Sequence, residues 1–239
     1  MAPSQSEIAR SLHFVSEMLE DRGEDVTSLR LDIAKIDPDD YSKAMDYTET
    51  LMLYTEDTII MYALFDKVGK NLGTSGKKDK FMFSYSKDAD VDWSLKILEG
   101  RVDFPGSKVL TIPGKKKNII LIVSDGSGTN NMNMLRLEVN SLDSKINRKY
   151  GGYMHLFHFK HTLYNPSRHV LTPPHMKLSK EEAKRVQEIY LIKNPRSQMP
   201  HILRDDRMAR WLGLRHDDVV MITRTNPNSG TSIYYRLCI

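Results

Sequence analysis

The apolar positions near the start of the chain follow a helical period. They recur every three or four residues, at Ile8, Leu12, Val15 and Leu19. Ser4 and Glu7 have the spacing of a capping box, and Gly23 follows the last periodic position. This pattern predicts an amphipathic helix over residues 5–22. A Pro-Asp-Asp start and mixed periodicity predict a second helix over residues 36–53.

Further along the chain the period shortens, and runs rich in β-branched and aromatic residues predict strands. Helical spacing returns between the runs, at residues 90–99 and 130–146. The predicted strands cover residues 58–65, 80–86, 118–126 and 153–161. Strands that alternate with helices favour an α/β sheet with crossover connections.

A proline-rich stretch over residues 164–179 interrupts this order. It holds three of the ten prolines, too many for a helix interior or a central strand, so we place a domain boundary there. Beyond it the pattern predicts a helix over residues 179–192 and a short helical segment over residues 199–213, stopped by Gly213. Two strands follow, over residues 217–225 and 231–239, joined by a turn at residues 226–230. We expect two domains of α/β (α+β) class, residues 1–163 and 164–239.

Composition narrows the class of protein. Hydrophobic residues make up 40% of the chain and charged residues 28%, a balance typical of globular domains. The chain has no apolar run of the roughly 18–20 residues that a membrane span needs, and its start lacks a secretory signal pattern. The single cysteine, Cys238, excludes an internal disulfide and a thiolate zinc site built by this chain alone. We expect a protein that works inside a cell, without membrane contact.

The sequence offers no convincing catalytic or metal-binding group. His155, His158 and His161 do not share one face of a strand, so they do not converge on a metal ion. The pair Glu182–Lys184 has the spacing of a nuclease motif, but helix capping accounts for Glu182. Serine-nucleophile, Walker and GxGxxG motifs are absent from the sequence. We expect no active site, no metal and no cofactor in this chain.

Lysines gather in two loops that flank predicted strands. These lysines are Lys77, Lys78, Lys115, Lys116 and Lys117. They can contact phosphates without reading base sequence, and a net charge of +4 permits such contact. They can also be a solvated loop, and the sequence alone leaves both interpretations open.

The stretch "MARWLGLRHDDVVMITR", residues 208–224, has the composition of a protein-interaction surface. Arg210 and Arg224 lie within it, and Tyr235 and Arg236 lie on the next predicted strand. Arginine, tyrosine and tryptophan carry much of the binding energy of protein interfaces. An ordinary domain surface has the same residues, so composition alone does not decide.

The last seventy residues resemble the C-terminal assembly domain of the fifth-largest shared subunit of eukaryotic RNA polymerases, a family that also has an archaeal form. The matching positions are Leu171, Pro173, His175, Pro200, Ile202, Asp206, Ala209, Arg210, Gly213, Asp218, Val219, Val220, Ile222, Arg224, Gly230, Tyr235 and Arg236. The chain departs from the family at Arg207 for proline, Trp211 for tyrosine, Asp217 for glycine and Met221 for lysine, and in the turn at residues 226–230. These changes fit a divergent cellular or large-DNA-virus lineage.

Residues 1–163 carry a less specific resemblance. The stretch "EMLEDRGEDV", residues 17–26, is similar to the end of the first helix in the family's N-terminal jaw domain, with its Asp-Arg-Gly. "NIILIVSDG", residues 118–126, stands where that domain has a central strand. The archaeal form lacks the jaw domain, so the resemblance implies the eukaryotic or viral type.

The resemblance implies a non-catalytic subunit of a multisubunit DNA-dependent RNA polymerase. The assembly domain would dock on the largest polymerase subunit, among other subunits, and the jaw-like domain would lie near downstream double-stranded DNA, with weak, sequence-independent contact through the loop lysines. The partner-binding residues would be His175, Pro200, Ile202, Arg210, Gly213, Arg224, Tyr235 and Arg236.

The same resemblance implies where in the cell the protein works, and it leaves one alternative function open. A cellular polymerase would place the chain in the nucleus, and a viral one in the host cytoplasm or the virion. The alternative is a free-standing DNA-binding transcription regulator, or a nuclease, that reuses the same small domain.

Overall fold

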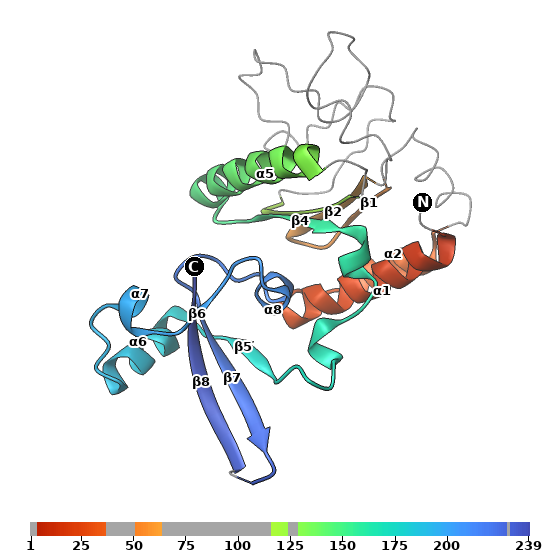
Figure 1. Ribbon diagram of the computed structural model, residues 1–239. Coiled ribbons are helices and arrows are strands. Elements are labelled where there is room, and N and C mark those ends of the chain that lie inside the picture. Colours follow the sequence, from red (N-terminus) through yellow and green to blue (C-terminus); the bar gives the residue numbers. More distant parts are fainter. Residues whose placement is uncertain (1–3, 37–50, 64–115, 124–128, 229) are drawn as a thin grey trace. The chain divides into compact units, whose positions relative to one another are not determined.

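The computed structural model describes residues 4–36, 51–63, 116–123, 129–228 and 230–239 of the chain. The chain divides into two compact units, Met1–Tyr164 and Asn165–Ile239 (Figure 1). The strand predicted at residues 80–86 and the helix predicted at residues 90–99 lie outside the described residues.

The N-terminal unit is built on a sheet with the strand order β1-β2-β3-β4. β1 pairs with β2 in antiparallel fashion, whereas β3 is parallel to both β2 and β4. The strands are β1 (Leu51–Tyr54), β2 (Thr58–Ala63), β3 (Asn118–Val123) and β4 (Met154–His158). A parallel β3–β4 pair requires a crossover, and α5 (Thr129–Tyr150) provides it, as predicted.

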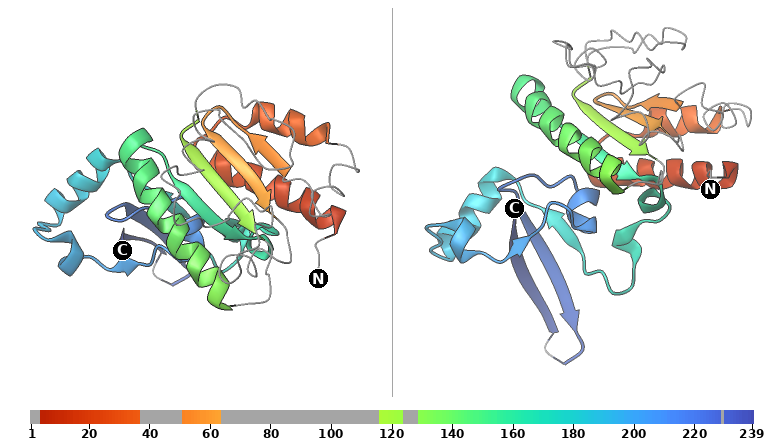
Figure 2. Two further views of the ribbon diagram at one scale, coloured as in Figure 1. Left: turned by 90° about the horizontal axis from the view of Figure 1, so that it is seen from above. Right: turned by 45° about the horizontal axis from the view of Figure 1, so that its top comes forward.

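Helices cover both faces of this sheet. Figures 1 and 2 show α5 on one face and α1 (Gln5–Asp21) with α2 (Thr27–Ala34) on the other. The central strands β2 and β3 are accordingly buried on both sides, and their apolar runs are continuous rather than alternating. The sheet is followed by a 3-10 turn, Phe159–Thr162, whose Thr162 hydroxyl lies 2.6 Å from that of Ser11 on α1.

The two ends of α1 are fixed as the sequence predicts. The Ser4 hydroxyl accepts a hydrogen bond from the Glu7 amide, while the Glu7 carboxylate accepts one from the Ser4 amide at 2.8 Å. At the other end Gly23 has a φ of +86°, and the Glu24 amide donates to the Leu19 carbonyl at 3.0 Å. This left-handed turn reverses the chain and directs Glu24 back toward the sheet.

Glu24 joins the end of α1 to β2 and to residues that flank β1 and β4. Its carboxylate accepts hydrogen bonds from the hydroxyls of Thr55 at 2.7 Å, Thr58 at 2.6 Å and Tyr153 at 3.1 Å. The guanidinium of Arg22 lies 5.1 Å above the ring of Tyr153. Burial raises the pKa of the Tyr153 hydroxyl above its usual value, which keeps that group a neutral donor to the carboxylate.

The C-terminal unit contains a second sheet, with the strand order β5-β7-β8-β6. β7 pairs with β5 and β8 in antiparallel fashion, and the two-residue β6 runs parallel to β8. Its elements are a 3-10 turn (Pro166–Arg168), β5 (His175–Lys177), α6 (Lys180–Ile189), α7 (Pro195–Gln198), β6 (His201–Ile202), α8 (Arg207–Trp211), β7 (Val219–Asn226) and β8 (Gly230–Cys238).

Two apolar clusters hold this unit together, one on each face of the β7–β8 ladder. On one face Val220 and Ile222 pack with Ala209 of α8 and with Leu214. On the other face Val219 and Leu237 pack with Leu178, Val186 of α6 and Met199. Successive residues of a strand point to opposite faces, so a single ladder supplies both clusters.

Several sequence predictions are corrected by the structure. Residues 51–53, predicted as the end of a helix, lie in strand β1, residue 36 is not helical, and residues 37–50 of that predicted helix lie outside the described residues. The strand predicted to reach residue 161 ends at His158. The helical segment predicted at residues 199–213 is helical only over Arg207–Trp211 and includes the short strand β6. The elements α2, β5, β6 and α7 were not predicted.

No helix in the described ranges combines the length and the apolar character that crossing a bilayer requires.

The first testable consequence concerns Glu24. Glu24→Ala removes the shared acceptor of three hydroxyls, two of which belong to the buried residues Thr55 and Thr58. We expect the free energy of unfolding of the N-terminal unit to fall by about 2 kcal/mol, since buried donors lose a charged partner. Urea unfolding of the full chain, followed by circular dichroism, measures this change.

Glu20→Ala is the matched control, because Glu20 forms an exposed ion pair with Arg30 at 2.6 Å. Such a pair contributes about 0.2–1 kcal/mol. Equal effects of the two substitutions would contradict the role assigned to Glu24.

Candidate protein-interaction surface

The register of β7 with β8 distributes the predicted partner-binding residues over two faces. Arg224 lies opposite Ser232 and Arg236 lies opposite Val220, so both arginines share a face. Tyr235 lies opposite Met221, on the other side of the ladder. We call these the basic face and the apolar face, respectively. Arg224 and Tyr235 therefore point in opposite directions.

On the basic face the two arginines differ in what they contact. Arg224 is exposed, and its guanidinium carbon lies 4.9 Å from the ring centre of Tyr234, which is also exposed. Arg236 is half-buried and donates from Nη1 to the carbonyl of His201 at 3.3 Å, which links β8 to β6. Arg224 is thus exposed to solvent, whereas Arg236 braces the sheet.

Other predicted residues of the basic side have structural contacts. The Nδ1 atom of His175 donates to the carbonyl of Pro173 at 2.6 Å. Pro200 is exposed, and its carbonyl accepts the Leu237 amide at 2.8 Å. Arg210 is half-buried on α8.

Two predicted partner-binding residues lie in the interior of the unit. Ile202 is buried in the cluster beneath α8. Gly213 is buried, has a φ of +64° and ends α8, where the Leu214 amide donates to the Ala209 carbonyl at 2.8 Å. These positions maintain the fold that presents the surface.

The apolar face carries an exposed patch that the sequence analysis did not single out. The ring of Tyr235 packs at a tilt against that of Tyr190 at the end of α6, with a ring-centre distance of 5.9 Å. The exposed apolar residues of this patch are Met176, Tyr190 and Ile233, and the exposed residues Ile189 and Leu191 flank Tyr190 in sequence. The run "IYLI" at residues 189–192 was the available signal, because four consecutive apolar residues exceed what one helix face can bury.

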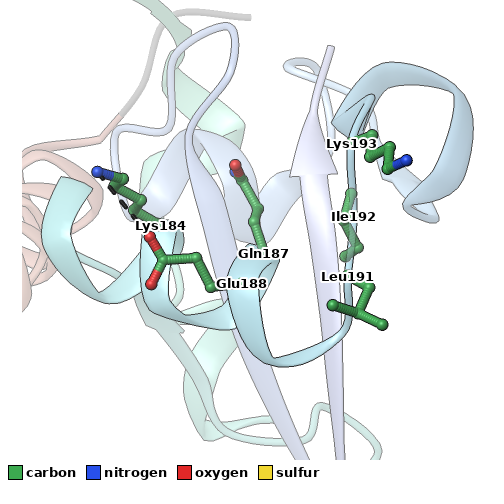
Figure 3. Close-up of a pocket in the computed structure, with 6 residues that line it drawn as sticks. All are labelled: Lys184, Gln187, Glu188, Leu191, Ile192 and Lys193. Carbon is green, nitrogen blue, oxygen red and sulfur yellow. Dashed lines mark ion pairs between the residues drawn. The ribbon is translucent and has the colours of Figure 1, made fainter.

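The C-terminal end of α6 is strained at Leu191. This residue has a φ of +54° and is 81% exposed. The Ile192 amide donates to the Gln187 carbonyl at 2.8 Å, a closure that usually has glycine at the position of Leu191. A hollow of about 380 Å³ lies beside it, lined by Lys184, Gln187, Glu188, Leu191, Ile192 and Lys193 (Figure 3). Its charged residues include the ion pair Lys184–Glu188 at 3.9 Å.

The backbone explains two departures from the resembled family. Asp217, where the family has glycine, has a φ of +69°, a conformation that glycine adopts without steric cost. Its carboxylate accepts two hydrogen bonds from Arg196, at 2.9 and 2.7 Å, and this pairing lowers the pKa of Asp217. Arg207, where the family has proline, is the first residue of α8, a position that suits proline.

Of the five loop lysines, Lys116 and Lys117 belong to the described residues, while Lys77, Lys78 and Lys115 lie outside them. Lys116 is only 6% exposed, and its ammonium donates to the carbonyls of Thr55 at 2.7 Å and Glu56 at 2.9 Å. Lys117 is exposed and pairs with Asp57 at 3.0 Å. Both interpretations that the sequence left open for Lys116, phosphate contact and a solvated loop, require exposure, whereas its buried ammonium fixes the turn between β1 and β2.

The histidines and the cysteine considered as chemical groups in the sequence analysis pack within the fold. His155 is buried against the ring of Tyr153. The rings of His158 and His161 contact each other edge to face. Burial raises the pKa of the Cys238 thiol to about 11, so it is protonated at neutral pH. Within the described ranges, no group of three or more His, Cys, Asp or Glu side chains is placed to hold a metal ion.

Known proteins match the C-terminal part of the chain. The family described as RNA polymerase Rpb5, C-terminal domain, matches residues 164–238. The chain is 41% identical over 71 residues to DNA-directed RNA polymerase subunit Rpo5 of Archaeoglobus fulgidus, covering 30% of this chain and 91% of that protein. It is 39% identical over 71 residues to Rpo5 of Methanocaldococcus jannaschii, covering 30% and 88%.

A eukaryotic relative matches over a similar length. The chain is 40% identical over 77 residues to the rpabc1 subunit of DNA-directed RNA polymerases I, II and III of Dictyostelium discoideum. That match covers 32% of this chain and 38% of the Dictyostelium protein.

The left-handed backbone at Asp217 gives a stability prediction. Asp217→Gly relieves the strain but loses the exposed pair with Arg196, so the two effects nearly cancel. Asp217→Ala loses the pair and keeps the strain. We expect the alanine variant to be less stable than the glycine variant by about 1 kcal/mol, measured by urea unfolding of the full chain.

Arg196→Ala is the control for the ion pair alone and should cost less than about 1 kcal/mol. An alanine variant as stable as the glycine variant would show that the backbone at Asp217 imposes no such constraint.

Proposed function

The chain belongs to the family of RNA polymerase subunits named Rpb5 and Rpo5, and we propose that it serves as a non-catalytic subunit of a multisubunit DNA-dependent RNA polymerase. The observation that carries this proposal is the extent of the archaeal match. The similarity covers 91% of a protein that is itself named as a polymerase subunit. The matched part of this chain therefore corresponds to nearly the whole of that archaeal subunit.

The docking partner in this proposal is the largest polymerase subunit. The basic face supports it, because Arg224 and Tyr234 are both exposed and stacked on each other. Arginine and tyrosine combine large contact area with directional donors, which makes them frequent centres of interface energy. An arginine already held against a ring also loses little conformational freedom on binding. An acidic surface of the partner would complement this face.

The second part of the proposal concerns the N-terminal unit, which would lie near downstream double-stranded DNA. Lys117 is exposed on this unit, Lys115 precedes it in the same lysine group, and Lys77 and Lys78 form the other lysine group of the sequence. Lysines at such positions contact phosphates without reading bases. The chain would be found where its polymerase works: in the nucleus for a cellular enzyme, or in the host cytoplasm and virion for a viral one.

The docking proposal predicts the effect of Arg224→Ala. The full chain, tagged and expressed in its source, should bring down the largest subunit, and the variant should recover about tenfold less of it, as expected for a central interface arginine. The substitution should leave the thermal unfolding of the free chain unchanged, because Arg224 packs on neither apolar cluster.

Arg185→Ala is the matched control, because Arg185 is an exposed arginine of the same unit, on α6. Undiminished recovery by Arg224→Ala would remove the basic face from the docking site. A wild-type chain that recovers no large polymerase subunit would contradict the proposed function itself.

The DNA proposal predicts a change in salt dependence. Polymerase that contains the combined variant Lys77→Ala, Lys78→Ala, Lys115→Ala and Lys117→Ala should hold double-stranded DNA more weakly. The slope of log K against log salt should become shallower by about 0.9 for each phosphate that the variant no longer neutralises. Fluorescence anisotropy of labelled DNA of two unrelated sequences measures both effects.

Unchanged slopes would contradict DNA contact by these lysines, and a weakening confined to one DNA sequence would contradict sequence-independent contact. Lys116 is kept in this variant, because its removal would disturb the turn between β1 and β2. Cleavage of DNA by the purified chain with added magnesium would contradict the non-catalytic assignment.

A further inference from the structure

Most of the outer edge of β8 has no neighbouring strand in the described part of the chain. β8 runs from Gly230 to Cys238, whereas β6 pairs only with Leu237 and Cys238. The rest of this edge, from Gly230 to Arg236, lies beyond the end of β6. Figure 1 shows β7 and β8 continuing together well past β6.

Two hydrogen bonds fix which backbone groups point outward. The Leu237 amide donates to the Pro200 carbonyl, at the β6 side, whereas the Cys238 amide donates to the Asp218 carbonyl, at the β7 side. In an antiparallel ladder the amide and carbonyl of one residue point the same way and alternate along the strand. Thr231, Ile233 and Tyr235 therefore point their backbone groups away from β7, and β6 reaches none of these residues.

Among the residues that the structure describes, none gives this edge the usual protection of exposed strands. Edge strands are normally blunted by proline, by bulges, by inward-pointing charges or by a covering segment. Here Ile233 is 53% exposed, and Tyr235 beside it packs against Tyr190 on the apolar face. An open edge of three donors and three acceptors, next to exposed apolar side chains, is a surface to which a strand can be added.

We propose that the polymerase partner of this chain adds an extended segment to the outer edge of β8 and pairs with Thr231, Ile233 and Tyr235. Unpaired groups on every second residue match an extended main chain, since a helix has no free backbone groups along its sides. The segment would span about five residues. This inference rests on the proposed function, and it names how the docking occurs.

The two faces of the hairpin specify the side chains of the added strand. On the apolar face its residues would lie beside Ile233 and Tyr235, near Tyr190, and would be apolar. On the basic face its residues would lie beside Tyr234 and Arg236, within the field of Arg224, and would be acidic. The partner segment would therefore alternate apolar and acidic residues.

The test compares Ile233→Pro with Ile233→Ala in the tagged full chain. Both substitutions remove the isoleucine side chain, but only proline removes the outward amide. Thr223, opposite Ile233, makes no hydrogen bond to that amide, because the amide points away from β7. We expect Ile233→Pro to recover about tenfold less polymerase than Ile233→Ala. Equal recovery by the two variants would overturn the proposal.

Amide hydrogen exchange on the wild-type chain gives a second readout that needs no variant. In the free chain the amides of Ile233 and Tyr235 should exchange fast, while those of Tyr234 and Arg236, which face β7, should be protected. In the purified polymerase the first pair should slow by at least about tenfold. Unchanged exchange of Ile233 and Tyr235 in the polymerase would overturn the proposal even if Ile233→Pro fails to fold.

The same measurements separate the possible failures. If the wild-type chain recovers polymerase and Ile233→Pro behaves like Ile233→Ala, strand addition is wrong while the proposed function stands. Protection of Ile233 and Tyr235 in the free chain that disappears on dilution would identify a second copy as the occupant, and would overturn the assignment to the polymerase partner.

Discussion

The antiparallel pairing of β7 with β8 is the interaction on which the C-terminal unit depends. Side chains alternate across the ladder, so its inner half supplies Val220 to one apolar cluster and Val219 to the other. Because the inner half is packed on both faces, it fixes the direction in which the two strands continue. In their outer half Arg224 and Tyr234 are exposed. These side chains are presented by regular backbone and not by a loop, which lowers the entropy lost when a partner binds them.

The N-terminal unit is held together differently at its edge. There the end of α1 is connected to the sheet by one carboxylate, that of Glu24, and the turn between β1 and β2 is fixed by one ammonium, that of Lys116. Both groups bond to neighbours that are distant in sequence, and both depend on turns that place them. Neighbouring lysines of this unit therefore differ in role, since the buried ammonium of Lys116 fixes a turn while that of Lys117 faces solvent.

The parts of the fold that the sequence predicts carry a strong local signal. α1 and α5 bury one face and show a helical period, β3 is a continuous buried run, and α6 begins with a capping box. α2 buries only Leu29, and β6 has two residues, so neither leaves a period to read. β5 follows two prolines, which indicated a break rather than a strand. For the surface, residue types pointed to Arg224 and Tyr235, but only the register with β7 shows that they lie on opposite faces.

The outer half of the hairpin, residues 223–226 and 230–234, packs on neither apolar cluster. Substitutions there cost the folded unit little, so selection for stability leaves this segment free to vary. It is also where residues 226–230 differ from the serine- and threonine-rich turn of the resembled family. Under the proposed function, the fold constrains the inner half of the hairpin and partner binding constrains its outer half. Under the same proposal, the outer half can change to suit a different polymerase partner while the fold stays the same.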